Sequence, residues 1–250
     1  MGIVEKLKPL WAIRYEKGKK KSGRPHGLVN IENYLLCLLF YYRTYTTQLF
    51  IGFFFKVDDA TISRGISRLE PLLSKISHIK KCRSLSENDL ETLIVDATEQ
   101  EINRPKKGQK KYYSGKKKRH TIKTELLITD KGRIVGLSKS VPGSIHDFKL
   151  RKQSDHIPRS SRVLADSGYQ GLQHIHKKAK IPIKKPEKKE LGRMPKLYNK
   201  ILSKKRVYVE HKLCEVKRFN ILGQKYRNNK KKYGIKMNII SGFINMKNGF

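Results

Sequence analysis

The longest apolar run of the chain limits its possible folds more than any other feature. It extends from Tyr34 to Phe55 and is long enough on paper to cross a bilayer as one helix. Arg43 lies in its middle beside several threonines, and an arginine at the bilayer centre costs about 2.5–3.5 kcal/mol. The run therefore predicts two shorter helices buried in a protein core, with a membrane span as the alternative.

The charge of the chain indicates what it binds. Of 250 residues, 57 are lysine or arginine and 21 are aspartate or glutamate, so the formal net charge is +36. Such a chain repels itself, and a polyanionic partner, above all nucleic acid, relieves the repulsion. Hydrophobic residues make up 37% of the chain, which is enough for a core in each of one or two domains and excludes a merely solvated basic tail.

Cysteine use and the N-terminus predict the compartment. Cys37, Cys82 and Cys214 are an odd number at wide spacing, which argues against a disulfide framework or a zinc ribbon and favours a reducing compartment. Residues 1–8 lack the apolar core of a signal peptide. We expect a cytoplasmic protein that is not embedded in a membrane.

Three short helices are expected in a domain over residues 30–77. Asn30 can cap a helix over residues 31–43, and Thr46 or Thr47 can cap a second helix that ends at residue 55. The third helix follows a short break, so the three form a helix-turn-helix arrangement. A generic helical subdomain is the alternative.

The third of these helices begins at Asp59 or Thr61 and has apolar residues at near-helical spacing on one face. Small polar and basic side chains on another face suit insertion into the major groove of DNA. These candidate DNA-binding residues are Ser63, Arg64, Ser67 and Arg68.

The remaining boundaries follow from charge and composition. Residues 1–29 are predicted to be a basic N-terminal arm, of which 17–27 are expected to be disordered and to lie on a phosphate backbone or in solvent. The polar residues 78–91 are predicted to be a linker. A second domain is expected over residues 92–248.

The hydrophobic period changes in this second domain. Short apolar or alternating runs predict strands, and a long helix follows them, so we expect a mixed α/β layer fold. The expected strands are 93–95, 121–129, 133–138 and 162–165, with 181–183 as an edge strand at best, and the expected helix is 204–222.

Two aspartates follow short apolar strands directly. Asp96 comes after residues 93–95 and Asp166 after residues 163–165, so neighbouring strands would bring both acids to one point. Hard carboxylate oxygens in pairs suit Mg²⁺ or Mn²⁺, whereas a single aspartate at such a place is more often a turn or cap residue.

A third acid is available on the long helix. Arg206, Glu210, Leu213 and Lys217 share a helix face at i, i+4, i+7 and i+11. An ordinary surface helix with salt bridges is the alternative to a functional role for Glu210.

Six motifs in order, over about 220 residues, resemble the DDE transposases of bacterial insertion sequences, in the branch that is also similar to Harbinger transposases. The helix-turn-helix near residues 30–75 comes first. The others are IVDATE at 94–99, YYSGKKKRHTIK at 112–123, PGSIHD at 142–147, LADSGYQG at 164–171 and RVYVEHKLCEVK at 206–217.

The resemblance implies a ribonuclease-H-like catalytic domain in which Asp96, Asp166 and Glu210 hold two divalent ions, Mg²⁺ or Mn²⁺. It implies a bacterial, nucleoid-associated DNA transposase that binds the terminal inverted repeats at the element ends and the target DNA. Such an enzyme cleaves DNA, transfers strands and works as a homo-oligomer on DNA. The family signature on the last helix is met by Arg206, Glu210 and Lys217, while its tyrosine position holds Ser203.

Further residues gain a role from the resemblance. Arg206 and Lys217 are candidates for contact with the transferred DNA end. Asp147 is a candidate metal ligand, although a favourable position at the start of a helix is the preferred interpretation. Tyr169 can stack on a base or simply be packed. Candidate phosphate contacts precede the second strand at Lys116, Lys117, Lys118 and Arg119.

Two other functions stay open. One is a catalytically inactive or domesticated DNA-binding derivative of the same fold. The other is a basic RNA-binding protein in which the acids are incidental.

Overall fold

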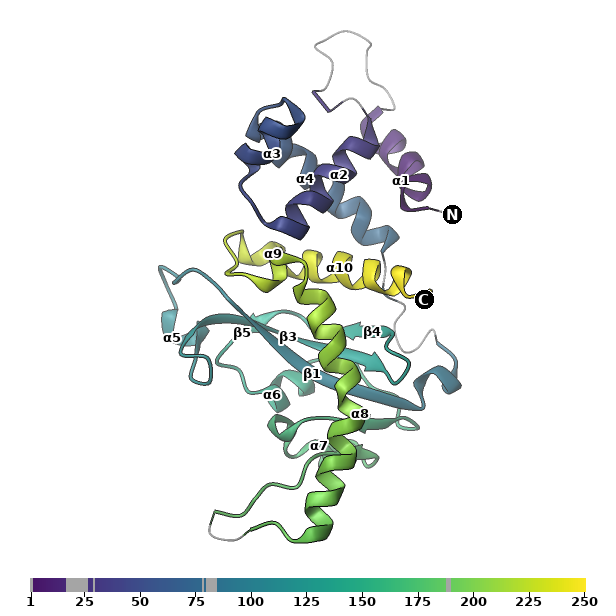
Figure 1. Ribbon diagram of the computed structural model, residues 1–250, viewed down its shortest axis with the longest axis vertical. Helices are drawn as coiled ribbons and strands as arrows, with labels where there is room; N and C mark the ends of the chain where they lie inside the picture. The colour runs from purple at the N-terminus through teal and green to yellow at the C-terminus, as the bar shows by residue number, and fades with distance from the viewer. Residues whose placement is uncertain (1, 17–26, 29, 78, 80–84, 188–189) are drawn as a thin grey trace.

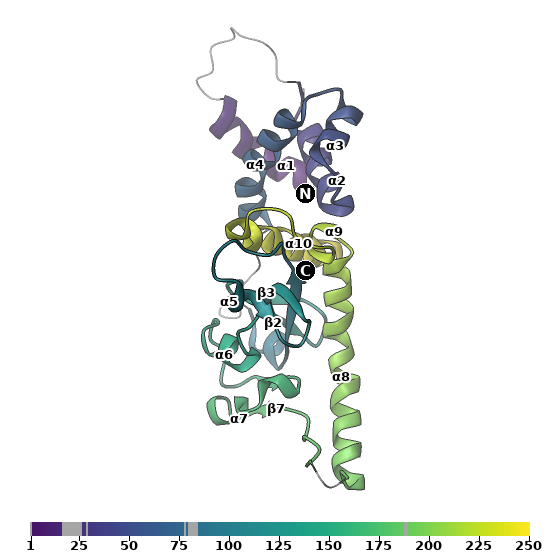
Figure 2. The same cartoon turned by 90° about the vertical axis from the view of Figure 1, so that its left-hand side faces the viewer.

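The molecule is elongated, with a helical bundle at one end, a sheet in the middle and one long helix reaching the other end (Figures 1 and 2). The computed structural model describes residues 2–16, 27–28, 30–77, 79, 85–187 and 190–250. Residues 17–26 and 29 of the predicted arm (1–29) and residues 78 and 80–84 of the predicted linker (78–91) therefore lie outside the described residues.

The three predicted N-terminal helices are confirmed as α2 (Ile31–Thr44), α3 (Gln48–Phe55) and α4 (Asp59–Ile76). Each begins after a side chain that accepts a hydrogen bond from a free backbone N–H of the first turn. The distances are 2.9 Å from Asn33 N to Asn30, 3.2 Å from Phe50 N to Thr47 and 2.5 Å from Thr61 N to Asp58.

The apolar run is buried as two helices, as expected. In the described part of the chain no helix is long and apolar enough to cross a membrane. A further helix, α1 (Ile3–Trp11), followed by a π-helical turn at Ala12–Glu16, lies inside the segment predicted as an arm and packs on α2 and α4.

A mixed sheet of seven strands follows, in the order β2-β3-β1-β6-β7, with β4 and β5 also paired to β3. Strands β1 and β3 are antiparallel, whereas β6 runs parallel to β1 and β7 parallel to β6. The strands are β1 (Thr92–Glu101), β2 (Tyr113–Ser114), β3 (Arg119–Thr129), β4 (Ile134–Leu137), β5 (Val141–Pro142), β6 (Arg162–Leu164) and β7 (Ala179–Lys180).

Helices cover both faces of the sheet. One face packs on α8 (Arg193–Lys217) and α10 (Tyr233–Lys247), and the other on α6 (Asp147–Lys152), α7 (Leu172–Ile175) and the 3₁₀ turn η4 (Ser167–Tyr169). Short elements complete the fold: η3 (Glu87–Leu90), α5 (Gln109–Tyr112), α9 (Asn220–Gly223) and η5 (Lys230–Lys232). The expected fold class is confirmed: a helical N-terminal part precedes a mixed α/β sheet flanked by helices, as in ribonuclease-H-like domains.

Three expected boundaries were wrong. Strand β1 continues through Asp96 to Glu101, because its polar residues still pair with β3. The edge strand is β7 at Ala179–Lys180 and not 181–183, where Pro182 has no N–H to donate. Helix α8 begins at Arg193 and ends at Lys217, and residues 220–223 form the separate α9.

The N-terminal bundle is docked on α10 by buried polar contacts as well as apolar packing. Lys236 Nζ on α10 lies 2.7 Å from Glu70 Oε1 on α4, and both side chains are about 95% buried, with exposed fractions of 4% and 5%. The hydroxyl of Tyr42 on α2 donates to the same Glu70 oxygen at 3.0 Å. One continuous core extends from α1 to the sheet face under α8.

Candidate active site

The parallel pairing of β1 with β6 places the two predicted aspartates side by side. Its register joins Thr92 to Arg162 and Ile94 to Leu164, residues that are 70 positions apart. Asp96 and Asp166 are also 70 positions apart and lie two residues beyond the last pair. Since side chains alternate along a strand, both carboxylates leave the sheet on the side of Ile94 and Leu164.

Asp96 is held by its own strand and by α8. Its Oδ1 accepts a hydrogen bond from Ala97 N at 2.8 Å, and its Oδ2 lies 3.7 Å from an Nη of Arg206. Burial raises the pKa of Asp96 to about 6, the Arg206 guanidinium opposes the shift, and the carboxylates of Asp166 and Asp147 add to it. The site therefore concentrates negative charge that one arginine offsets only in part.

Asp166 caps the turn that follows β6. Its Oδ1 accepts a hydrogen bond from Gly168 N at 2.7 Å, which begins η4. A Cβ at position 168 would lie 2.6 Å from Asp147 Oδ2 and 3.0 Å from Asp166 Oδ1. The two carboxylate oxygens are thus no farther apart than the sum of those distances, and only a glycine leaves the space between them open.

Asp147 has the helix position that was preferred for it and also lies close to Asp166. It is the first residue of α6, where a negative charge is favourable, and its carboxylate also faces Asp166 across Gly168. Lys123 Nζ lies 2.8 Å from Asp147 Oδ1.

Glu210 is not brought to the aspartates. It is exposed on the flank of α8, since the buried stripe of that helix passes through Leu202, Val209 and Val216. Within the described ranges, no three His, Cys, Asp or Glu side chains are gathered closely enough to hold a metal ion. The structure thus places Asp166 near Asp96 and near Asp147, without gathering the three into one ligand set, and leaves Glu210 in solvent.

The two basic residues predicted on α8 are in different environments. The side chain of Arg206 is 13% exposed and points at Asp96, whose side chain is 17% exposed. Its first partner is therefore an acid of the site and not a DNA end. Lys217 is the last residue of α8, exposed and about 16 Å along the axis from Arg206.

The basic run before β3 forms an exposed turn close to the aspartates. Lys116, Lys117 and Lys118 lie between β2 and β3, and Lys116 lines the same pocket as Asp166. Arg119 differs, because its guanidinium donates to Glu101 Oε2 at 2.7 Å. The three lysines are therefore better placed to meet a phosphate than the arginine.

A stacking role for Tyr169 does not fit the structure. Its ring is fully buried in the core on the far face of the sheet, among residues such as Val163 and Leu172. Burial, followed by nearby acids that include Glu125, raises the pKa of Tyr169 well above its ordinary value. The tyrosine side chain packs beneath the turn that carries Asp166, and its buried ring is not available to stack on a base.

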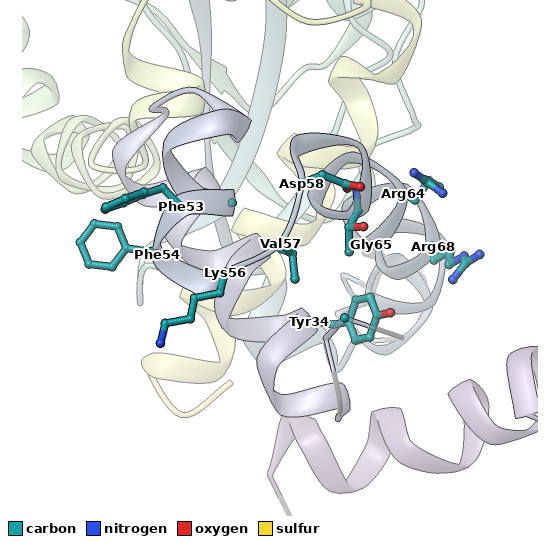
Figure 3. Close-up of a pocket in the computed structure, with 12 residues that line it drawn as sticks. Tyr34, Phe53, Phe54, Lys56, Val57, Asp58, Arg64, Gly65 and Arg68 are labelled. Atoms are coloured by element: carbon teal, nitrogen blue, oxygen red, sulfur yellow. The ribbon is translucent and has the colours of Figure 1, made fainter. Parts of the chain in front are cut away.

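Two of the predicted DNA-binding residues of α4, Arg64 and Arg68, line a groove of about 1040 Å³ between α3 and α4, whereas Ser63 and Ser67 lie outside its lining. Arg64 and Arg68 extend from α4 on one side of this groove and Phe53 from α3 on the other (Figure 3). Arg64 and Ser67 are exposed, and Ser63 and Arg68 are half-buried.

Arg68 has a structural partner inside the protein. Its guanidinium lies over the ring of Tyr15, 5.7 Å from the centroid, and the Tyr15 hydroxyl donates to Arg68 O at 3.3 Å. Arg64 Nε donates to Ala60 O in its own helix at 3.0 Å, but its side chain is exposed, so Arg64 is the better candidate for contact with bases.

Sequence reasoning missed Lys123, which is buried between acids. Its Nζ donates to Ile145 O at 2.7 Å and lies 3.3 Å from Glu99 Oε1. Lys123 and Glu99 are directly opposed in the antiparallel β1–β3 register. A correct pairing of the two strands from the sequence would have revealed this cross-strand ion pair.

Comparisons with known proteins bear on the same residues. Residues 95–245 match the family described as DDE superfamily endonuclease, and residues 26–77 match the helix-turn-helix of DDE superfamily endonuclease. A probable transposase for insertion sequence element IS702 from Microchaete diplosiphon is 41% identical over 236 residues, which cover 92% of this chain and 85% of the relative. No solved structure gives a significant match. The first family match contains Asp96, Asp166 and Glu210.

Proposed function

Because this chain belongs to the DDE superfamily of endonucleases, we propose that it is the transposase of a bacterial insertion sequence, which binds the ends of its element and cuts and rejoins DNA. The observation that carries the proposal is the parallel register of β1 and β6, which sets Asp96 beside Asp166 inside the matched region. The charge of +36 suits a polyanionic substrate of this kind.

The donor groups fit the divalent ions that such enzymes use. Carboxylate oxygens are the ligands that Mg²⁺ and Mn²⁺ prefer, and Gly168 keeps open the space beside Asp166 that a side chain would fill. In this proposal Asp96 and Asp166 are ligands of two ions. Glu210, which is exposed and not gathered with them in this structure, becomes the third ligand when ions and DNA are bound. When bound, two such ions activate water or a terminal 3′-hydroxyl and stabilise the leaving oxygen of an in-line displacement at phosphorus.

The residues of the chain prepare this site in separate ways. Arg206 favours the anionic form of Asp96 against the effect of burial, so the carboxylate is available as a ligand at neutral pH. Gly168 N fixes one oxygen of Asp166. Glu210 lies about one helical turn after Arg206, exposed to solvent and accessible to an ion from outside.

DNA contacts are proposed at two places. Helix α4 enters the major groove at an element end with Ser63, Arg64 and Ser67, while Lys116, Lys117 and Lys118 contact phosphates near the aspartates. An insertion sequence has two ends, so we propose that a homo-oligomer holds them together.

A catalytically inactive DNA-binding derivative of the same fold is the second candidate. Ser203 in the tyrosine position of the signature and the exposed side chain of Glu210 favour it. Such a protein would bind element ends and leave them uncut.

The test uses Asp96→Asn, Asp166→Asn and Glu210→Gln, each assayed for Mg²⁺-dependent cleavage of element-end DNA and for DNA binding. We expect each variant to lose cleavage and keep near-normal binding, while the control Asp130→Asn, which changes an exposed acid in the turn after β3, keeps both. Normal cleavage by one variant removes that residue from the site. Binding without cleavage in the unmodified protein supports the second candidate.

A further inference from the structure

A pocket of about 410 Å³ opens beside Asp166, and its lining combines acids with lysines from separate parts of the chain. Asp147, Asp166 and Glu99 form its acidic side, and Gly168 lies beside the two aspartates. Lys116 reaches it from the β2–β3 turn, and Lys184 from the segment that follows β7. Both lysines are exposed.

A third lysine of the lining, Lys123, already has partners inside the protein. Lys123 is buried, donates to Ile145 O and lies within ion-pair distance of Asp147 and Glu99. Lys116 and Lys184, in contrast, form no ion pair within the described part of the chain. The cations of this pocket that are available to a ligand are therefore Lys116 and Lys184.

The segment that carries Lys184 is tied to helix α8. The side chain of Asn199 accepts a hydrogen bond from Ile183 N at 2.9 Å and donates one to Ile183 O at 3.0 Å, so it satisfies both backbone groups of the residue before Lys184. Gln170 Nε2 also donates to Pro182 O at 3.3 Å. These bonds fix the backbone next to Lys184 at the mouth of the pocket.

We propose that this pocket is a phosphate site for the DNA strand that is cut or joined, in which Lys184 and Lys116 bind backbone phosphates and Asn199 is the positioning residue for Lys184. The acidic side of the pocket repels a phosphate, so cations at its mouth are needed to bring a DNA backbone close to Asp166. Lysine suits this role, because its compact charge binds phosphate from many directions. The inference rests on the proposed function.

The test measures binding of a short fluorescent DNA duplex to the full chain in Ca²⁺, an oxygen-binding cation like Mg²⁺. Lys184→Ala is expected to weaken binding about three- to tenfold and to lower the slope of log K against log salt by about 0.9, the value for one phosphate contact. Lys185→Ala is the matched control, since Lys185 is an exposed neighbour outside the lining. It should change neither quantity beyond error.

A second set of duplexes locates the contact. In each, a different phosphate is replaced by a neutral methylphosphonate. The loss caused by Lys184→Ala should disappear on the duplex in which the contacted phosphate is neutral, and remain on the others.

Asn199→Ala tests the positioning role. Asn199→Ala should weaken binding, and this loss should disappear on the same methylphosphonate duplex as the loss caused by Lys184→Ala. The double variant should bind DNA no more weakly than Lys184→Ala alone. A merely structural role for Asn199 would give additive losses on every duplex. Thermal unfolding checks that Asn199→Ala is folded, and if it is not, Lys184→Ala decides the question.

Equal losses for Lys184→Ala and Lys185→Ala, or a Lys184→Ala loss that persists on every modified duplex, would overturn the phosphate site. The binding assays test the phosphate site, and the cleavage assays of the preceding subsection test the proposed function. If Asp96→Asn still cleaves DNA, the catalytic assignment fails, whereas the phosphate contact is judged by the duplexes alone.

Discussion

Replacing Lys236 by methionine should destabilise the whole molecule, because it leaves the carboxylate of Glu70 buried without its counter-charge. Removing one partner of a buried ion pair costs about 3–5 kcal/mol. Tyr42 continues to donate to Glu70 Oε1, so the lower end, about 3 kcal/mol, is expected. For a chain of this size that corresponds to a fall of about 6–12 °C in the unfolding midpoint, measured by circular dichroism at neutral pH.

The double variant Lys236→Met/Glu70→Gln distinguishes the cost of an unpaired buried charge from the cost of lost packing. A neutral glutamine keeps the volume and the Tyr42 hydrogen bond, so much of the lost stability should return. Lys231→Met, which changes an exposed lysine of η5, is the control and should shift the midpoint little. A Lys236→Met midpoint equal to that of the control, or a double variant less stable than both single ones, would refute the reasoning.

In EDTA, Asp96→Asn should stabilise the protein above pH 6, because the folded pKa of about 6 exceeds the ordinary 3.8 and the ionised carboxylate therefore costs about 3 kcal/mol. This gain in the free energy of unfolding should vanish below about pH 4. Urea titrations at several pH values measure it, and a gain that does not change with pH would contradict this cause. Gly168→Ala should abolish Mg²⁺-dependent cleavage while the melting curve stays near normal, since its methyl group fills the space between two carboxylates; cleavage at the normal rate would show that this space is not used. Arg64→Ala should weaken binding to element ends more than to other DNA, whereas Arg68→Ala should chiefly lower the melting midpoint by removing the contact with Tyr15. Competition assays and melts of both variants check this, and identical behaviour would show that the two arginines have one role.

Local patterns were sufficient wherever the structure depends on neighbouring residues. Asn30 and Thr47 were identified as helix caps because a cap needs only a side-chain oxygen next to the first turn. The change from helical to alternating apolar spacing likewise predicted a helical part followed by a sheet. The six motifs lie in the two regions that match the family, residues 26–77 and 95–245, with Ile94 just outside the second.

Strand ends and single side chains were predicted less well. Strand β1 runs past Asp96 because β3 pairs with it along its whole length, and the polar residues after Val95 hide this continuation in the sequence. Tyr169 follows Asp166 in a glycine-flanked turn that suggests exposure, yet the turn directs the ring into the core.

Composition and short-range spacing by themselves determined that this chain carries a large positive charge, three short helices, two of them with a predicted cap, and two acids that follow apolar strands. Only the tertiary structure decided that Asp96 and Asp166 are neighbours, that Arg206 faces Asp96 and that Glu210 faces solvent. The reason is physical. Caps and periods depend on backbone groups a few residues apart, whereas strand register and the inward face of a helix depend on how side chains distant in sequence fill one shared core.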